Sequence, residues 1–139
     1  MSVTRTTDFE IVEPGFVSVR FHGRLEADET GAVFDCITEA IEGRPFFVLE
    51  AFMDDIDGMT PEARRVAAER LRRLPDRAFA IIGGSFAQKI IAKLVMTAVS
   101  MLGRSDRNIA RFFDDKEAAR SWLREYAARR NADAEQKTS

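Results

Sequence analysis

The first third of the chain opens with apolar and polar residues that alternate with a period of two. In residues 16–22, Val17, Val19 and Phe21 alternate with polar side chains, which is typical of a strand with one buried face. Residues 9–13 form a second such run. The pair Pro14-Gly15 between them fits a type II turn, because proline fixes φ at one central position and glycine accepts a positive φ at the next. This pattern predicts an antiparallel hairpin.

Beyond the hairpin, amphipathic segments of helical length alternate with short apolar runs. The predicted helices span 28–42, 60–74, 86–102 and 114–130, with N-caps at Asp28, Thr60 and Asp114 and with Glu117 completing a capping box. The predicted strands span 45–52, 78–83 and 108–113, and residues 54–58 between the first of these and the next helix form an acidic loop. The order ββαβαβαβα predicts an α/β domain, a mixed and mostly parallel sheet of about five strands flanked by about four helices.

Length and composition are those of one globular domain, which we expect to span residues 1–130, followed by a flexible polar tail at 131–139. The lone cysteine, Cys36, cannot form an internal disulfide, and the first residues lack the apolar run of a signal peptide. The apolar stretch near residues 90–102 is too short to span a bilayer. These features predict a cytoplasmic protein without stable membrane insertion.

The charges give no general reason to expect nucleic-acid binding. The formal net charge is −2, and the arginines of residues 64–73 are partly offset by Glu62 and Glu69 without interleaved aromatic residues. The single histidine, His22, excludes a site with several histidine ligands. We therefore expect no nucleic acid, no resident metal and no cofactor, and no residue set amounts to a catalytic centre.

The acidic loop is the first candidate site. Asp54, Asp55 and Asp57 follow a buried strand at the edge where α/β sheets usually place ligands. They could hold Mg²⁺, dock a protein partner together with Thr60, or form an ordinary solvated turn beside the start of a helix. The sequence leaves the three alternatives open.

The predicted helix 86–102 is the second candidate, because apolar residues cover more of its circumference than packing on a sheet requires. The surplus face is assigned to Ile91, Ala92, Val95, Met96 and Val99. Such a face can belong to an enclosed core helix, bury itself against a second subunit or partner, or cover a small hydrophobic ligand.

Several segments, in this order and spacing, resemble the STAS family of bacterial anti-sigma factor antagonists, and more narrowly its SpoIIAA-like branch. They are residues 21–25, 47–50, 59–64, 81–83 and 111–115, followed by Glu117-Ala118 and Trp122-Leu123. The resemblance covers about residues 9–126. It implies the SpoIIAA-like fold, which is related in shape to CRAL-TRIO lipid-binding domains.

The resemblance implies a non-enzymatic regulatory or protein-interaction module, and we expect a homodimer that also docks a protein partner. The alternative is a carrier or sensor of a lipid-like molecule held between residues 86–102 and the sheet. Regulatory members carry an Asp-Ser-Ser-Gly-like motif after the third strand, where a kinase phosphorylates a serine. In residues 53–60 only Gly58 matches, and acidic and apolar residues stand where the serines would be.

Overall fold

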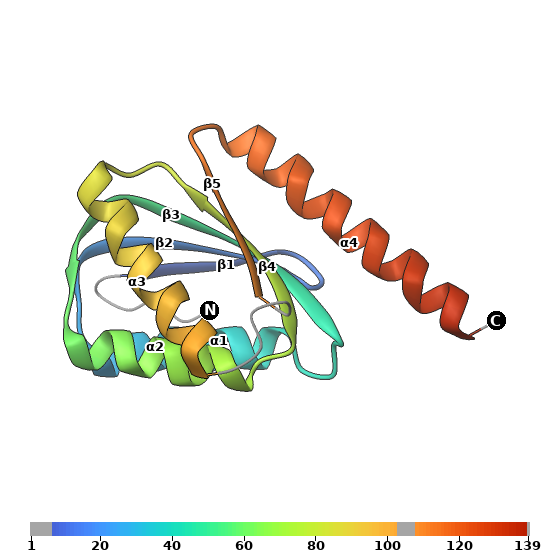
Figure 1. The fold of residues 1–139 in the computed structure, drawn as a ribbon, viewed down its shortest axis with the longest axis horizontal. Helices are drawn as coiled ribbons and strands as arrows, with labels where there is room; N and C mark the ends of the chain where they lie inside the picture. The colour runs from blue at the N-terminus through green and yellow to red at the C-terminus, as the bar shows by residue number, and fades with distance from the viewer. Residues whose placement is uncertain (1–6, 103–107, 139) are drawn as a thin grey trace.

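The computed structural model describes residues 7–102 and 108–138 of the chain, drawn in Figure 1. The elements follow the predicted order: β1 (Thr7–Glu13), β2 (Phe16–Leu25), α1 (Ala27–Ala40), β3 (Phe46–Met59), α2 (Pro61–Arg73), β4 (Asp76–Ile82), α3 (Phe86–Leu102), β5 (Asn108–Phe113) and α4 (Lys116–Thr138). The predicted fold class is confirmed.

The five strands form one sheet in the order β1-β2-β3-β4-β5. The hairpin β1–β2 is antiparallel, and β2, β3, β4 and β5 run parallel to one another. Gly15 closes the hairpin with a φ of 81°, as the predicted type II turn requires. The sheet is therefore mixed and mostly parallel, with β1 and β5 at its edges.

Strand β3 is longer than the sequence predicts. The stretch 54–58, predicted as an acidic loop, continues β3 and pairs with β2 as far as Leu25 opposite Met59. Two register shifts, between Arg20 and His22 and between Gly23 and Arg24, absorb the extra residues of β3. The prediction of a loop was wrong because Ile56 is buried and anchors the extension in the core.

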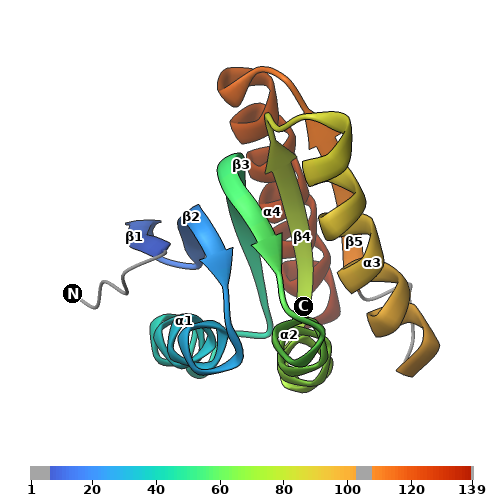
Figure 2. The same ribbon diagram turned by 90° about the vertical axis from the view of Figure 1, so that its left-hand side faces the viewer.

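Helices α1, α2 and α3 cover one face of the sheet and α4 covers the other, as the turned view in Figure 2 shows. Phe34 of α1, Leu71 of α2 and Val95 of α3 share a core with Val17 and Phe79 on the first face. On the second face, Leu123 and Tyr126 of α4 pack on β2, β3 and β4. The alternation along β2 thus fills two separate cores.

The helix caps partly differ from the predictions. Thr60 caps α2 as predicted, since its hydroxyl accepts from the Ala63 amide at 3.1 Å. The N-cap of α1 is Glu26, with Asp28 inside the first turn, because the chain leaves β2 early enough to start the helix sooner. At α4 the cap is Asp115, whose carboxylate accepts from the amides of residues 117 and 118, while Asp114 lies one position too early.

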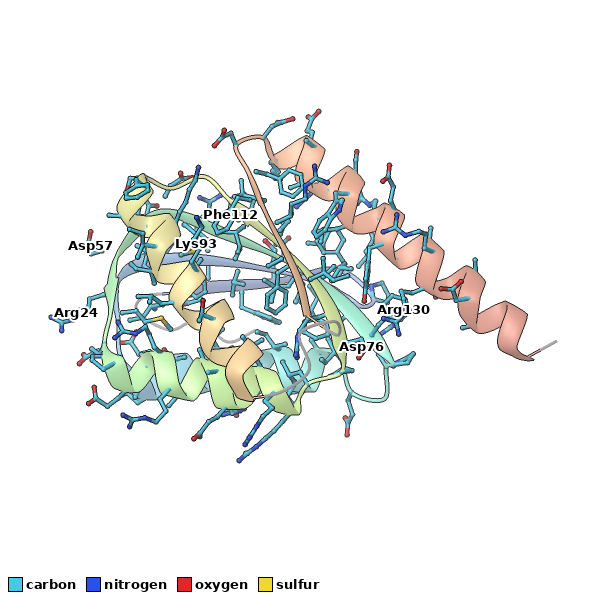
Figure 3. The ribbon with its side chains drawn as sticks, viewed as in Figure 1. Arg24, Asp57, Asp76, Lys93, Phe112 and Arg130 are labelled. Atoms are coloured by element: carbon cyan, nitrogen blue, oxygen red, sulfur yellow. The ribbon has the colours of Figure 1, made fainter. Side chains whose placement is uncertain are left out.

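Helix α4 continues to Thr138, through most of the segment predicted as a flexible tail, and its end projects past the sheet in Figure 1. Its start is fixed by packing, and Arg130 ties its middle to Asp76 at the start of β4 (3.2 Å), as Figure 3 shows. Residues 131–134 are exposed. Fraying of this last stretch in solution stays a prediction.

Candidate functional site

The carboxylates of Asp54, Asp55 and Asp57 contact different parts of the protein or solvent, and Asp54 contacts the turn before α3. Asp54 accepts a hydrogen bond from the Gly84 amide at 2.9 Å, in the turn between β4 and α3. Gln88, in the first turn of α3, donates to the carbonyl oxygens of Asp54 and Ile56 at 2.9 and 2.8 Å. The start of α3 is thereby tied to the end of β3.

The turn before α3 has little capacity left for an external anion. Gly83 and Gly84 both adopt positive φ, 73° and 91°. Ser85 and Gln88 form a reciprocal capping box, in which each side chain accepts from the other residue's amide. Amides that could cradle a phosphate are therefore used by the protein's own side chains.

Asp55 belongs to a second arrangement, around His22. The imidazole of His22 lies 3.3 Å from the Asp55 carboxylate through Nδ1 and 2.8 Å from the Asp8 carboxylate through Nε2. The three side chains tie β1, β2 and β3 together. Because the two carboxylates contact opposite ring nitrogens, they cannot share one metal ion with this imidazole.

Asp57 points away from the body of the protein into solvent (Figure 3). Asp54, Asp55 and Asp57, predicted to share one acidic loop, therefore do not converge on a common point. Within the described residues, no group of three or more histidine, cysteine or acidic side chains could hold a metal ion. Thr60, the fourth residue of the predicted docking loop, is occupied as the cap of α2.

Helix α3 has two distinct faces. Ala92 and Val95 are buried against the sheet, and Ile91 is half-buried beside them. The side chains of Met96 and Val99, also assigned to the surplus face, lie outside the described residues. On the opposite side Phe86, Ile90 and Leu94 are 79%, 40% and 47% exposed. We call these three residues the outer row.

Two lysines run alongside the outer row. Lys89 lies 3.7 Å from the exposed carboxylate of Asp114, and Lys93 lies over the ring of Phe112 with its ammonium 5.7 Å from the ring centre, as Figure 3 shows. Residues 86–102 contain no acidic side chain. The outward side of α3 is thus a row of apolar side chains bordered by positive charge.

Under the inner face of α3 lies an apolar cavity of about 100 Å³, lined by residues of α1, α2, α3 and the sheet. Ile91, Ala92 and Val95 line it together with Met53 and Ile56. An engineered apolar cavity of roughly 150 Å³ in another protein stays dry and binds benzene, so a volume of this order can receive a small apolar group. Three residues of the predicted surplus face therefore meet a cavity rather than the surface.

The sequence reasoning missed an ion pair on the other side of the sheet. Glu50, in the middle of β3, is completely buried, and Arg120 of α4 donates to both its oxygens at 2.9 and 2.8 Å. Burial raises the pKa of the Glu50 carboxyl, but hydrogen bonds from Arg120 and Ser18 outweigh that effect and lower the pKa below its ordinary value. A single acid inside an apolar run was the only signal in the sequence.

Cations stacked on aromatic rings surround this pair. Arg120 and Arg124 of α4 lie over Phe16, 5.8 and 5.6 Å from its ring centre, and Arg20 lies 4.3 Å from that of Phe52. Such stacking fixes α4 on the sheet by contacts that need no carboxylate partner. We assign this cluster to stability, because its best-placed groups already bind one another.

Comparison with solved structures identifies the architecture. An uncharacterised protein from Shewanella loihica PV-4, described as a DUF3478 family member with a SpoIIAA-like fold, superimposes with a TM-score of 0.62 at 18% identity, covering 88% of this chain and 98% of that one. The chain has the SpoIIAA-like fold. The resemblance stated from the sequence is confirmed at the level of fold.

Two anti-sigma factor antagonists share this fold. SpoIIAA in its unphosphorylated form matches with a TM-score of 0.55 at 16% identity, covering 86% of this chain and 96% of that one. An antagonist from Mycobacterium paratuberculosis matches with a TM-score of 0.52 at 11% identity, covering 89% and 99%. No protein-family model and no curated protein sequence matches the chain.

Among the described residues, no helix has the length and apolar character needed to cross a membrane.

Proposed function

We propose that this chain is a non-enzymatic regulatory module that binds a protein partner through the outward side of α3. The observation that carries the proposal is the outer row. Single exposed apolar residues are common on protein surfaces, but Phe86, Ile90 and Leu94 lie on successive turns of one helix and form a continuous strip. Burying such a strip against another protein would remove it from water.

The outer row continues toward the residues that the sequence assigns to partner docking. Gln88 holds the first turn of α3, which contains Phe86, against residues 54–56. This turn therefore lies at the same edge of the sheet as the end of β3, which carries the solvent-facing Asp57. We assign Asp57 to the rim of the docking surface. Of the other residues of the predicted docking loop, Asp54 supports the start of α3 through the Gly84 amide, whereas Asp55 and Thr60 contact His22 and the first turn of α2. Two proteins that share the fold are anti-sigma factor antagonists, which favours a regulatory role.

Affinity capture from the native host tests the proposal. The variant Phe86→Ser/Leu94→Ser should lose a partner that the wild-type protein retains, because the apolar strip is interrupted at both ends. Ile11→Ser is the matched control, since Ile11 is 54% exposed on the distant edge strand β1 and should leave capture unchanged. Capture of the same partner in equal amount by both variants would remove the basis of the proposal.

A second candidate function, the carriage or sensing of a small hydrophobic molecule, is favoured by the apolar cavity under α3. Its lining comes from all three α1–α3 helices and the sheet and is apolar, so an occupant would contact mainly apolar atoms. The volume of about 100 Å³ matches a small apolar group or the end of a longer chain, and not a whole lipid.

Filling the cavity tests this alternative. Ala92→Leu should abolish co-purification of any hydrophobic molecule, measured by mass spectrometry of extracts from the native protein, because the added side chain occupies the cavity. Leu94→Ala, on the outward side of the same helix, should leave the extracted molecule in place. Extracts of the wild-type protein without any hydrophobic molecule, from several expression hosts, would count against ligand carriage.

A further inference from the structure

We infer that the outer row docks an acidic amphipathic helix of the partner protein, an inference that rests on the proposed function. Phe86, Ile90 and Leu94 are spaced by four residues, so they lie on one side of α3 and extend about 12 Å along it. Among the described residues, Lys89 and Lys93 lie on one side of the strip and the exposed Ala87 lies on the other. An apolar ridge of one facing helix fits such a strip by the usual packing of ridges into grooves.

The positive charge of helices α2 and α3 favours an acidic partner. Helices α2 and α3 together carry seven basic side chains and two acidic ones, although the whole chain has a net charge of −2. The basic residues of α3, Lys89 and Lys93, border the outer row directly. The contact of Lys89 with Asp114 is long, and the Asp114 carboxylate is 92% exposed, so a partner's carboxylate can replace it. Acidic residues beside the partner's apolar ridge would complement this border.

A second copy of this chain is a poor occupant of the same surface. In an antiparallel pair of α3 helices related by a twofold axis, the same flank of each helix meets the other, so the lysines would face the lysines. Like charges brought together in this way oppose association. Self-association through α3 in this arrangement is therefore disfavoured, and the homodimer that the sequence assigned to the surplus face of this helix stays a prediction.

The shape of the strip also favours a helix over a lipid surface or a nucleic acid. Helices that lie in a membrane interface bury a broad apolar face, whereas the large exposed apolar side chains on the described part of α3 are the three of the outer row, spaced one turn apart. Sequence-tolerant binding of single-stranded nucleic acids uses several stacking aromatic residues, and the outer row contains one, Phe86.

The test uses a synthetic amphipathic peptide of about 18 residues, long enough to form a helix, with leucines along one stripe and glutamates on both flanks. A second peptide has lysine in place of every glutamate. Fluorescence anisotropy at low salt should show the wild-type protein binding the acidic peptide at least ~10-fold more tightly than the basic one. Lys89→Glu/Lys93→Glu should reverse that preference, and Phe86→Ser/Leu94→Ser should weaken binding of the acidic peptide by about 10-fold.

Matched controls separate docking from general charge. Arg129→Glu changes an exposed cation on α4, and Ile11→Ser removes an exposed apolar side chain on β1, so both should leave binding of the acidic peptide unchanged. Equal affinity of the wild-type protein for the two peptides, or no binding of either, would overturn the inference. Two other results would also overturn it. One is co-sedimentation of the protein with vesicles containing about 30% phosphatidylserine, abolished by Phe86→Ser/Leu94→Ser and by no other variant. The other is concentration-dependent self-association that Phe86→Ser/Leu94→Ser abolishes.

The result also distinguishes the inference from the function on which it rests. If Phe86→Ser/Leu94→Ser loses the native partner in affinity capture but Lys89→Glu/Lys93→Glu retains it, the docking surface stands and the acidic class of partner is wrong. If neither variant changes capture, both the docking surface and the class of partner are wrong.

Discussion

At the scale of single residues, the turn between β4 and α3 depends on a glycine for two separate reasons. Gly83 has a φ of 73°, which a residue with a side chain adopts only with strain. A Cβ at this position would also overlap the carboxylate of Asp54, the group that accepts from the Gly84 amide. The residue therefore determines both the conformation of the turn and the contact between β3 and the start of α3.

We predict that Gly83→Ala lowers the free energy of unfolding by about 2–3 kcal/mol, from backbone strain together with the displacement of Asp54. Gly43→Ala is the control, because Gly43 also has a positive φ, 79°, but a Cβ there meets no atom within 4 Å. That variant should lose about 1 kcal/mol. Chemical denaturation of both variants measures the difference, and equal losses would show that the overlap with Asp54 has no energetic weight.

Glu50 makes the stability of the protein depend on pH. Its pKa is lowered in the folded state, so the carboxylate contributes stability above the pKa it has when unfolded, and that contribution is lost as pH falls through the folded value. Unfolding at pH values from about 6 down to about 3 should therefore show a steeper loss for the wild-type protein than for Glu50→Gln. Parallel curves for the two proteins would contradict this assignment.

At neutral pH, Glu50→Gln should cost about 2 kcal/mol, less than the roughly 3–5 kcal/mol of a fully buried pair, because the Arg120 side chain is 25% exposed and can regain water. The double variant Glu50→Met/Arg120→Met should be more stable than Glu50→Gln alone, since it leaves no unpaired charge.

At the scale of elements, strand and helix positions were predictable wherever the apolar period was regular. The bounds of α3 and β5 agree with the sequence because their apolar runs end sharply at polar or glycine residues. The extension of β3 was not predictable, because its pairing partner, the end of β2, lies about 30 residues earlier and leaves no local signal. The ion pair of Glu50 was not predictable for the same reason, because its partner Arg120 lies 70 residues away in the sequence.

The orientation of α3 was the other element-scale difficulty. A helix that is apolar around most of its circumference gives no phase, so the sequence could not decide which residues face the sheet. Ala92 was assigned to the surplus face, but its small side chain allows the helix to approach the sheet, and it is buried. The bulky Phe86 is left outside. Helix α3 therefore does expose apolar surface, but at Phe86, Ile90 and Leu94 and not at Ala92 and Val95.

At the scale of the whole molecule, charge is unevenly distributed. The layer of α2 and α3 is basic, whereas the rest of the chain is acidic enough to make the total −2. A molecule with such a separation of charge turns its basic side toward an acidic partner before contact, which raises the association rate and makes it sensitive to salt. Helices α2 and α3 would thus orient the protein toward its partner before contact, and α3 would then bind that partner.

Helix α3 separates the apolar cavity from the outer row by its own thickness. An occupant of the cavity that displaced Ala92 and Val95 would also displace Phe86 and Leu94, because all four residues belong to one helix. Molecules bound on the two sides would consequently alter each other's affinity by one common factor, in either direction and without any contact between them. The affinity of the outer row for its partner would then depend on whether the cavity is occupied.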